Sequence, residues 1–207
     1  MVLLLVGIAL TVLMCCITKQ LAGYLPPDRY RQTMTLLIPA YLLINGLFTL
    51  FTRTQGDYPV IFVPLHVYIQ ALGWDCRTFS DVYKLLSGGW EEAAAPTLLP
   101  LVSAAQNIVL FLPFGFLLTG ACGSDTIIAP SSAGCDAGRN AAAHGLSTTV
   151  ILLLGCLLSA VIEFTQLFLK LGWFEADDIL HNTLGTYAGV RVYRRLMKAP
   201  VRKEGRM

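Results

Sequence analysis

Glu163 is the residue of this 207-residue chain whose position most needs an explanation. It is the single carboxylate within an apolar segment that runs from Leu146 to Leu171. An ionisable side chain near the middle of a bilayer costs about 2.5–3.5 kcal/mol on insertion scales, so such a residue needs a partner or a function. A carboxylate in this setting can bind a hydrogen-bond donor or act as a base.

Small and polar residues repeat on one face of this segment and on one face of the segment that follows. The first set, at i, i+4, i+8 and i+11, is Gly155, Ser159, Glu163 and Gln166. The second set, at i, i+4, i+7 and i+11, is Asp178, Asn182, Gly185 and Gly189. Such faces pack on other helices, and a GxxxG pair permits close backbone approach. The short connection predicts antiparallel neighbours, with Glu163 and Gln166 at the depth of Asn182 and the Asp177-Asp178 pair.

Two further residues, Asn107 and His66, are predicted to lie at the same side of the membrane and to join this candidate ligand-binding cluster. Structural roles remain open for each member. Asp177 or Asp178 could cap a helix, the two asparagines could join helices, Glu163 could be a neutral buried acid, and His66 could be packing. His181 follows Asp178 at i+3, a spacing that a metal site could use. The six cysteines show no spacing typical of metal ligands. We therefore predict no metal, no other cofactor and no disulfide.

The elements that must position these residues are apolar helices. The chain is 55% hydrophobic and 14% charged, well below the charge of a soluble domain. A bilayer core of about 30 Å needs roughly 20 helical residues. We therefore predict an all-α, polytopic transmembrane bundle of about five helices, near Val2–Ile17, Met34–Phe51, Leu98–Ala121, Leu146–Leu171 and Asp178–Met197, with Pro113 kinking the third.

The connections divide the chain further. Residues Val60–Trp74 are too apolar for a free loop and too short to span, which predicts an interfacial or re-entrant segment between the second and third helices. Residues 122–145 are rich in Gly, Ala and Ser and predict a flexible cytoplasmic loop. The membrane domain then covers residues 1–197, with its motifs in 60–192, and residues 198–207 form a basic tail.

Lysine and arginine predict the orientation. The first connection and the C-terminal tail are basic, whereas the second and fourth connections are rich in Asp and Glu. The positive-inside rule places the tail in the cytoplasm and the N-terminus outside, so the polar cluster faces outward. Nucleic-acid binding has no support, because the basic tail is short and lacks interleaved aromatics.

Three stretches resemble the VanZ-like family. Asn107–Leu118 is similar to its motif with an Asn-rich start and Pro113-x-Gly115, and Phe62–Leu65 is similar to an earlier proline motif. Glu163-x-x-Gln166 followed by Asp177-Asp178-x-x-x-Asn182-x-x-Gly185 is similar to its second signature. The family's usual arginine between these last two parts aligns with Gly172, so Lys170 or Arg53 would have to supply that charge.

The resemblance implies a bacterial integral membrane protein, in a family whose founding member is linked to resistance to the glycopeptide teicoplanin. We interpret the chain as an envelope protein whose outer polar cluster contributes to that resistance or handles lipid, with membrane lipids, a lipid-linked cell-wall precursor or another polar headgroup as partner. The alternative is a membrane hydrolase or transferase with Glu163 or Asp178 as base and His66 or His181 helping. No recognised catalytic motif supports it, so a non-enzymatic role is favoured, and a channel or transporter has less support still.

Overall fold

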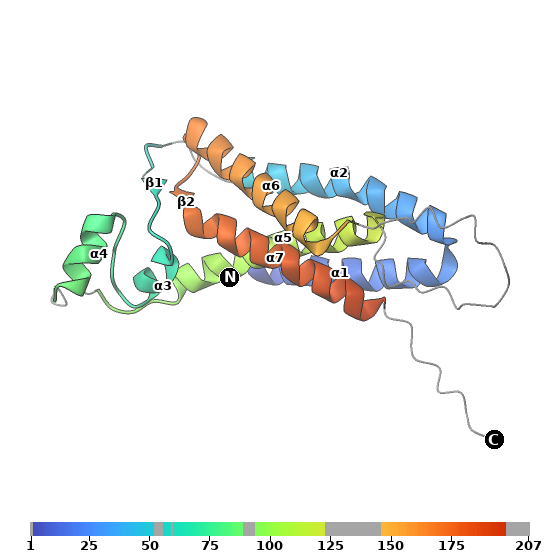
Figure 1. Cartoon of the computed structure of the whole chain (residues 1–207), viewed down its shortest axis with the longest axis horizontal. Coiled ribbons are helices and arrows are strands. Elements are labelled where there is room, and N and C mark those ends of the chain that lie inside the picture. Colours follow the sequence, from blue (N-terminus) through green and yellow to red (C-terminus); the bar gives the residue numbers. More distant parts are fainter. Residues whose placement is uncertain (1, 52–55, 59, 89–93, 123–145, 198–207) are drawn as a thin grey trace, which may run out of the picture.

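The chain folds into a helical bundle, as predicted from the sequence. The structure, a computed structural model, describes residues 2–51, 56–58, 60–88, 94–122 and 146–197. Five long helices lie side by side (Figure 1): α1 (Val2–Tyr24), α2 (Pro27–Phe51), α5 (Leu99–Cys122), α6 (Thr148–Phe168) and α7 (Ala176–Leu196). Two short helices, α3 (His66–Ala71) and α4 (Phe79–Leu86), lie at the end of the bundle where α5 and α7 begin and α6 ends. We call this end the site end.

Helix α5 is the centre of the bundle, because it contacts α1, α2, α3, α6 and α7. Its closest neighbour is α7, and glycine makes that approach possible. A Cβ on Gly115 would collide with the carbonyl group of Thr186, and a Cβ on Gly189 would collide with the carbonyl group of Leu112. Gly185 has the same relation to the carbonyl group of Ile108. The two backbones therefore touch directly, as in small-residue interfaces of membrane helices.

The face of α7 that carries glycine packs on two neighbouring helices. Gly185 and Gly189 contact α5, whereas the side chain of Thr186 fills the space that a Cβ on Gly155 of α6 would occupy. The sequence pattern placed the GxxxG pair on the face turned toward α6. Since α7 packs on both α5 and α6, one broad face divides between them.

In the middle of the bundle and toward its far end, side-chain hydrogen bonds and aromatic packing join α2 and α7 to α5. Phe116 of α5 and Tyr193 of α7 pack edge to face, with ring centroids 5.2 Å apart. Along α2, Asn45 donates a hydrogen bond to the Tyr41 hydroxyl (2.7 Å), which itself donates to the carbonyl of Leu110 in α5 (2.8 Å). These contacts hold α2 and α7 on α5.

Three helices of the described chain are long and apolar enough to cross a membrane, in the stretches Gly7–Tyr24, Leu99–Cys122 and Thr148–Phe168. Helices α2 and α7, with 25 and 21 residues, are long enough but more polar. The polarity of α7 points inward, since Asp177, Asp178, His181, Asn182 and Thr186 are all buried. The neighbouring helices shield these polar side chains of α7 from lipid.

The interfacial segment predicted at Val60–Trp74 is a strand, a turn and a short helix. Strand β1 (Val60–Ile61) pairs in parallel with β2 (Phe174–Glu175), a contact that the sequence did not predict. Val63 and Val67 are buried as the segment crosses the site end. Residues 123–145 of the predicted loop and the tail 198–207 lie outside the described residues.

We predict that Gly189→Ala destabilises the bundle by about 1–3 kcal/mol, because the added methyl group must push apart two backbones. Gly46→Ala is the matched control, since a Cβ there would meet nothing within 4 Å. It should be neutral or slightly stabilising in a helix. Thermal unfolding in detergent checks both, and equal midpoints for the two variants would contradict the close α5–α7 contact.

Candidate functional site

The buried face of α6 consists of Ile151, Gly155, Ser159, Glu163 and Gln166. It therefore contains the whole small and polar set that the sequence spacing identified. Three of these residues form polar contacts with other elements, and each contact reaches a different part of the molecule.

The first contact joins α6 to α7 directly. The Asn182 amide donates a hydrogen bond to the Ser159 hydroxyl at 2.8 Å, and the two side chains are buried. The amide oxygen of Asn182 has no hydrogen-bond partner within the described part of the chain. A buried acceptor without a partner is costly, so this oxygen is a candidate contact for a donor group.

The second contact places Glu163 at the start of α7. Its carboxylate accepts a hydrogen bond from the backbone N–H of Glu175, the N-cap residue of α7, at 3.3 Å. The first N–H groups of a helix lack intrahelical partners and carry partial positive charge. The Glu163 side chain is only 2% exposed, so the beginning of α7 provides a hydrogen-bond donor to a polar group that lipid would not satisfy.

The third contact joins α6 to α2. The Gln166 amide donates a hydrogen bond to the carbonyl of Thr49 at 3.2 Å, and its own oxygen has no partner among the described residues. Asn107, expected in the same cluster, lies half-buried in α5.

Asp177 connects α7 to the segment around α3. Its two carboxylate oxygens accept hydrogen bonds from the backbone N–H groups of Leu65 (2.7 Å) and Val67 (3.0 Å), so it caps α3 rather than its own helix. Leu65 has a left-handed backbone (φ 63°), a conformation that costs energy for a residue with a Cβ. Asp177 therefore fastens the segment before α3 to α7.

His66 and His181 lie near this fastening. The Nδ1 of His66 is 2.9 Å from the carbonyl oxygen of Cys76, which can only accept, so Nδ1 carries the proton. The Nε2 of His181 is 3.1 Å from the Tyr68 hydroxyl. His66 thus holds the chain after α3, and His181 holds α3 on α7.

Four of the residues expected in one cluster fall into two groups around the start of α7, whereas Gln166 contacts α2 and Asn107 lies in α5. One group, facing α6, contains Ser159, Glu163 and Asn182. The other group, facing α3, contains Asp177, His181 and His66 with Tyr68, a residue that the sequence reasoning did not include. No group of three or more His, Cys, Asp or Glu side chains suited to a metal ion occurs in the described ranges.

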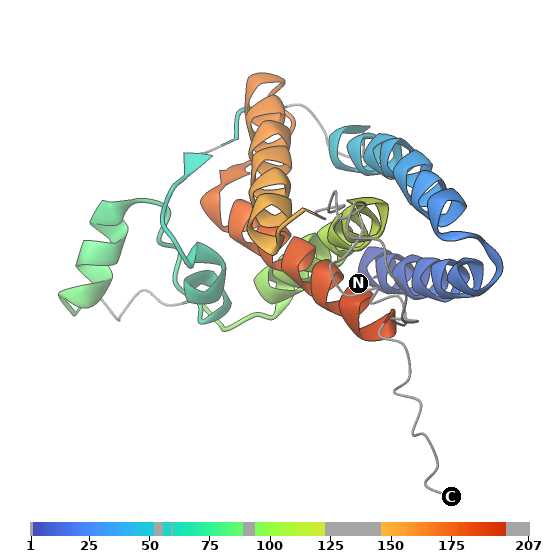
Figure 2. The same ribbon diagram turned by 45° about the vertical axis from the view of Figure 1, so that its right-hand side comes forward.

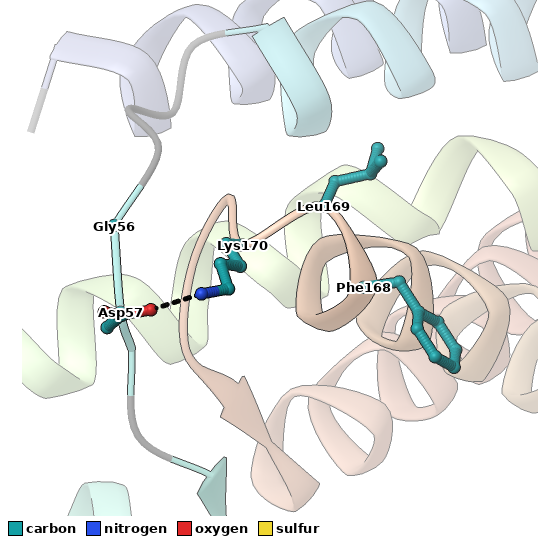
Figure 3. A pocket seen from close by; sticks show the side chains of 5 residues that line it. All are labelled: Gly56, Asp57, Phe168, Leu169 and Lys170. Carbon is teal, nitrogen blue, oxygen red and sulfur yellow. Dashed lines mark hydrogen bonds and ion pairs between the residues drawn. The ribbon is translucent and has the colours of Figure 1, made fainter.

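An open depression of about 470 Å³ lies beyond the end of α6, lined by Gly56, Asp57, Phe168, Leu169 and Lys170. Figure 3 shows the Lys170 ammonium turned toward the Asp57 carboxylate, at 2.6 Å, while the Phe168 ring points away from both. The hydrogen bond and the charge of Lys170 lower the pKa of Asp57, and Asp57 raises the pKa of Lys170 in return. Lys170 is thus paired at the surface, and Arg53, the other candidate for the family's arginine, lies outside the described residues.

Comparison with known families decides the membership of the chain. The VanZ/LLP1 family model matches residues 6–198, which include helices α2 to α7 and all but the first four residues of α1. The chain belongs to the VanZ/LLP1 family. No curated protein and no solved structure matches it. Family membership and three apolar helices of spanning length identify this VanZ/LLP1 member as a membrane protein.

We predict that Asp177→Ala releases α3 from α7 in this VanZ/LLP1 protein. Two N–H groups would lose their acceptor, and the loss at the buried Val67 costs about 1–3 kcal/mol. Hydrogen exchange at Leu65 and Val67 should become at least about tenfold faster, since 1.4 kcal/mol corresponds to a factor of ten. Asp75→Ala removes an exposed carboxylate near α3 and should leave these amides unchanged. Unchanged exchange in Asp177→Ala would contradict the fastening.

Proposed function

We propose that this chain is a multi-pass protein of the bacterial cell membrane that protects the envelope or handles its lipids. In this proposal Glu163, Gln166, Asp178 and Asn182 bind the polar headgroup of a membrane lipid or of a lipid-linked cell-wall precursor. The N-terminus and the site end face outward, because the positive residues concentrate in the first connection and the tail.

The observation that carries the proposal is the burial of polar groups beyond what packing needs. Glu163, Gln166 and Asn182 are each at most 4% exposed, inside helices whose other faces are apolar. Alanine or leucine would pack there without the cost of removing a carboxylate and two amides from water. The amide oxygens of Gln166 and Asn182 lack partners in the described structure, which favours a ligand that donates hydrogen bonds.

The link to teicoplanin rests on the family resemblance and on location. Glycopeptides act on cell-wall precursors outside the membrane, and the proposed orientation places the polar groups on that side. A protein that binds the headgroup of such a precursor, or alters lipid at that surface, would change access of the antibiotic to its target.

The geometry favours binding over the alternative of a hydrolase or transferase. A general base must lie within reach of a nucleophile or of a bound substrate. The Glu163 carboxylate, one of the two candidate bases, instead contacts the N–H that begins α7. His66 and His181 each use one ring nitrogen to hold the segment around α3.

We expect a susceptible host that expresses the wild-type chain to tolerate more teicoplanin than the empty host, with little change for vancomycin. Glu163→Gln should abolish that tolerance, because the amide keeps the shape of the side chain but removes its charge. The measurement is the growth-inhibitory concentration of both antibiotics at equal membrane levels of each protein.

Asp75→Asn is the matched control, since it removes one charge from an exposed carboxylate at the same end of the bundle. It should retain full tolerance. If wild type confers none, resistance is not the function of this chain, and if Glu163→Gln confers as much as wild type, the polar cluster does not carry it.

A further inference from the structure

Helix α4 is a structurally self-contained helix. Thr78 and Asp81 form a capping box: the Thr78 hydroxyl accepts from the N–H of Asp81, and the Asp81 carboxylate accepts from the N–H of Thr78 at 2.9 Å. This arrangement satisfies the first free N–H groups without help from the rest of the protein. The helix ends at Ser87, followed by Gly88 with φ 103°.

One face of α4 is apolar and uncovered. Phe79, Tyr83 and Leu86 follow one another at i, i+4 and i+7, and they are 67%, 73% and 79% exposed. At about 100° per residue these three side chains fall within one narrow sector of the helix. Asp81 and Lys84 lie on the opposite side of the same helix. No residue of α4 is buried by the described part of the protein.

The position of α4 is unusual for a helix with such a face. Figures 1 and 2 both show it beyond the site end, lying across the long direction of the bundle rather than along it. Apolar side chains on the adjoining segments are exposed as well: Leu72 after α3 is 67% exposed, and Leu98 and Leu99 at the start of α5 are 74% and 76% exposed. Exposed apolar side chains therefore occur on α4, on the segment that follows α3 and at the beginning of α5, a helix of membrane-spanning length.

We infer that α4 lies in the interface of the bilayer at the site end, with Phe79, Tyr83 and Leu86 inserted among the lipids. The exposed leucines at the start of α5 select lipid as the occupant, because α5 is apolar over the length needed to cross the membrane and Leu98 and Leu99 lie where it begins. Aromatic side chains such as Phe79 and Tyr83 are favoured at this level of the membrane.

The charges of α4 indicate how it binds. Asp81 and Lys84 cancel within the helix, and Arg77 and Asp75 form an ion pair directly before it (2.7 Å). Attraction to anionic lipid requires an excess of Lys or Arg, which is absent from residues 75–88. Insertion therefore depends on apolar burial and not on the charge of the lipid.

This anchor has a consequence for the polar groups of the bundle. Helix α4 follows α3 through the chain that His66 holds by the Cys76 carbonyl, and α3 is fastened to α7 by Asp177. A helix fixed at the interface would thus set the depth of the start of α7 relative to the headgroups. The inference does not require the proposed function, and it stands if the chain confers no tolerance.

The test places the photo-crosslinking residue p-benzoylphenylalanine at position 83 or at position 84 of the full chain, reconstituted in phosphatidylcholine vesicles. Tyr83 faces the proposed lipid contact and Lys84 the solvent, so the two neighbours are matched in everything except direction. After illumination, mass spectrometry measures covalent lipid adducts. We expect several-fold more adduct at position 83 than at position 84, unchanged when anionic phosphatidylglycerol is added.

Three results would overturn the inference. Equal adduct at both positions would mean that the helix has no lipid-facing side. Adduct at position 83 only with anionic lipid would mean that charge drives binding. Crosslinks from position 83 mainly to another protein or to a second copy of this chain would assign the face to a protein partner. Position 79 serves as a second apolar-face probe if the variant at position 83 does not fold.

Discussion

The backbone contact between α5 and α7 is the constraint on which the rest of the site depends. Gly115, Gly185 and Gly189 let the two helices approach until carbonyl groups lie where side chains would otherwise be. Dispersion forces and close packing, rather than the exclusion of water, hold helices together in lipid, so such an approach is a main source of stability. It fixes where α7 begins, and the contacts of Asp177, Glu163 and Asn182 are arranged around that point.

The start of α7 then contacts two different segments through polar groups. Asp177 binds the backbone of the α3 segment, while the α6 side presents Glu163, Ser159 and Asn182. Polar groups in a membrane protein must find partners inside the protein, and here they find them between segments that are distant in the chain. The same contacts that satisfy these groups also hold α3, and through it α4, at the site end.

The sequence predicted the five long helices and the buried set on α6, because apolar length and helical spacing are local signals. Hydropathy misplaced some ends: α1 continues past Ile17 to Tyr24, since a helix can persist where its residues become more polar. The hydrogen bonds from Leu65 and Val67 to Asp177 could not be predicted, because the donors are backbone N–H groups and the residue types at these positions do not indicate them. The parallel pairing of Val60–Ile61 with Phe174–Glu175 is equally non-local. That Gly185 and Gly189 contact α5 was not predicted, because residue spacing shows which side chains share a helix face but not which helix packs on that face.

The central claim is that the buried polar groups of α6 and α7 hold a ligand and do not serve packing alone. Native mass spectrometry of the purified chain, with thermal unfolding in parallel, tests it most directly. The account predicts that wild type retains a polar lipid or precursor, and that Glu163→Gln loses it while keeping nearly the same unfolding midpoint. Equal lipid retention in both proteins, or loss of the lipid only together with the fold, would show that these residues are structural.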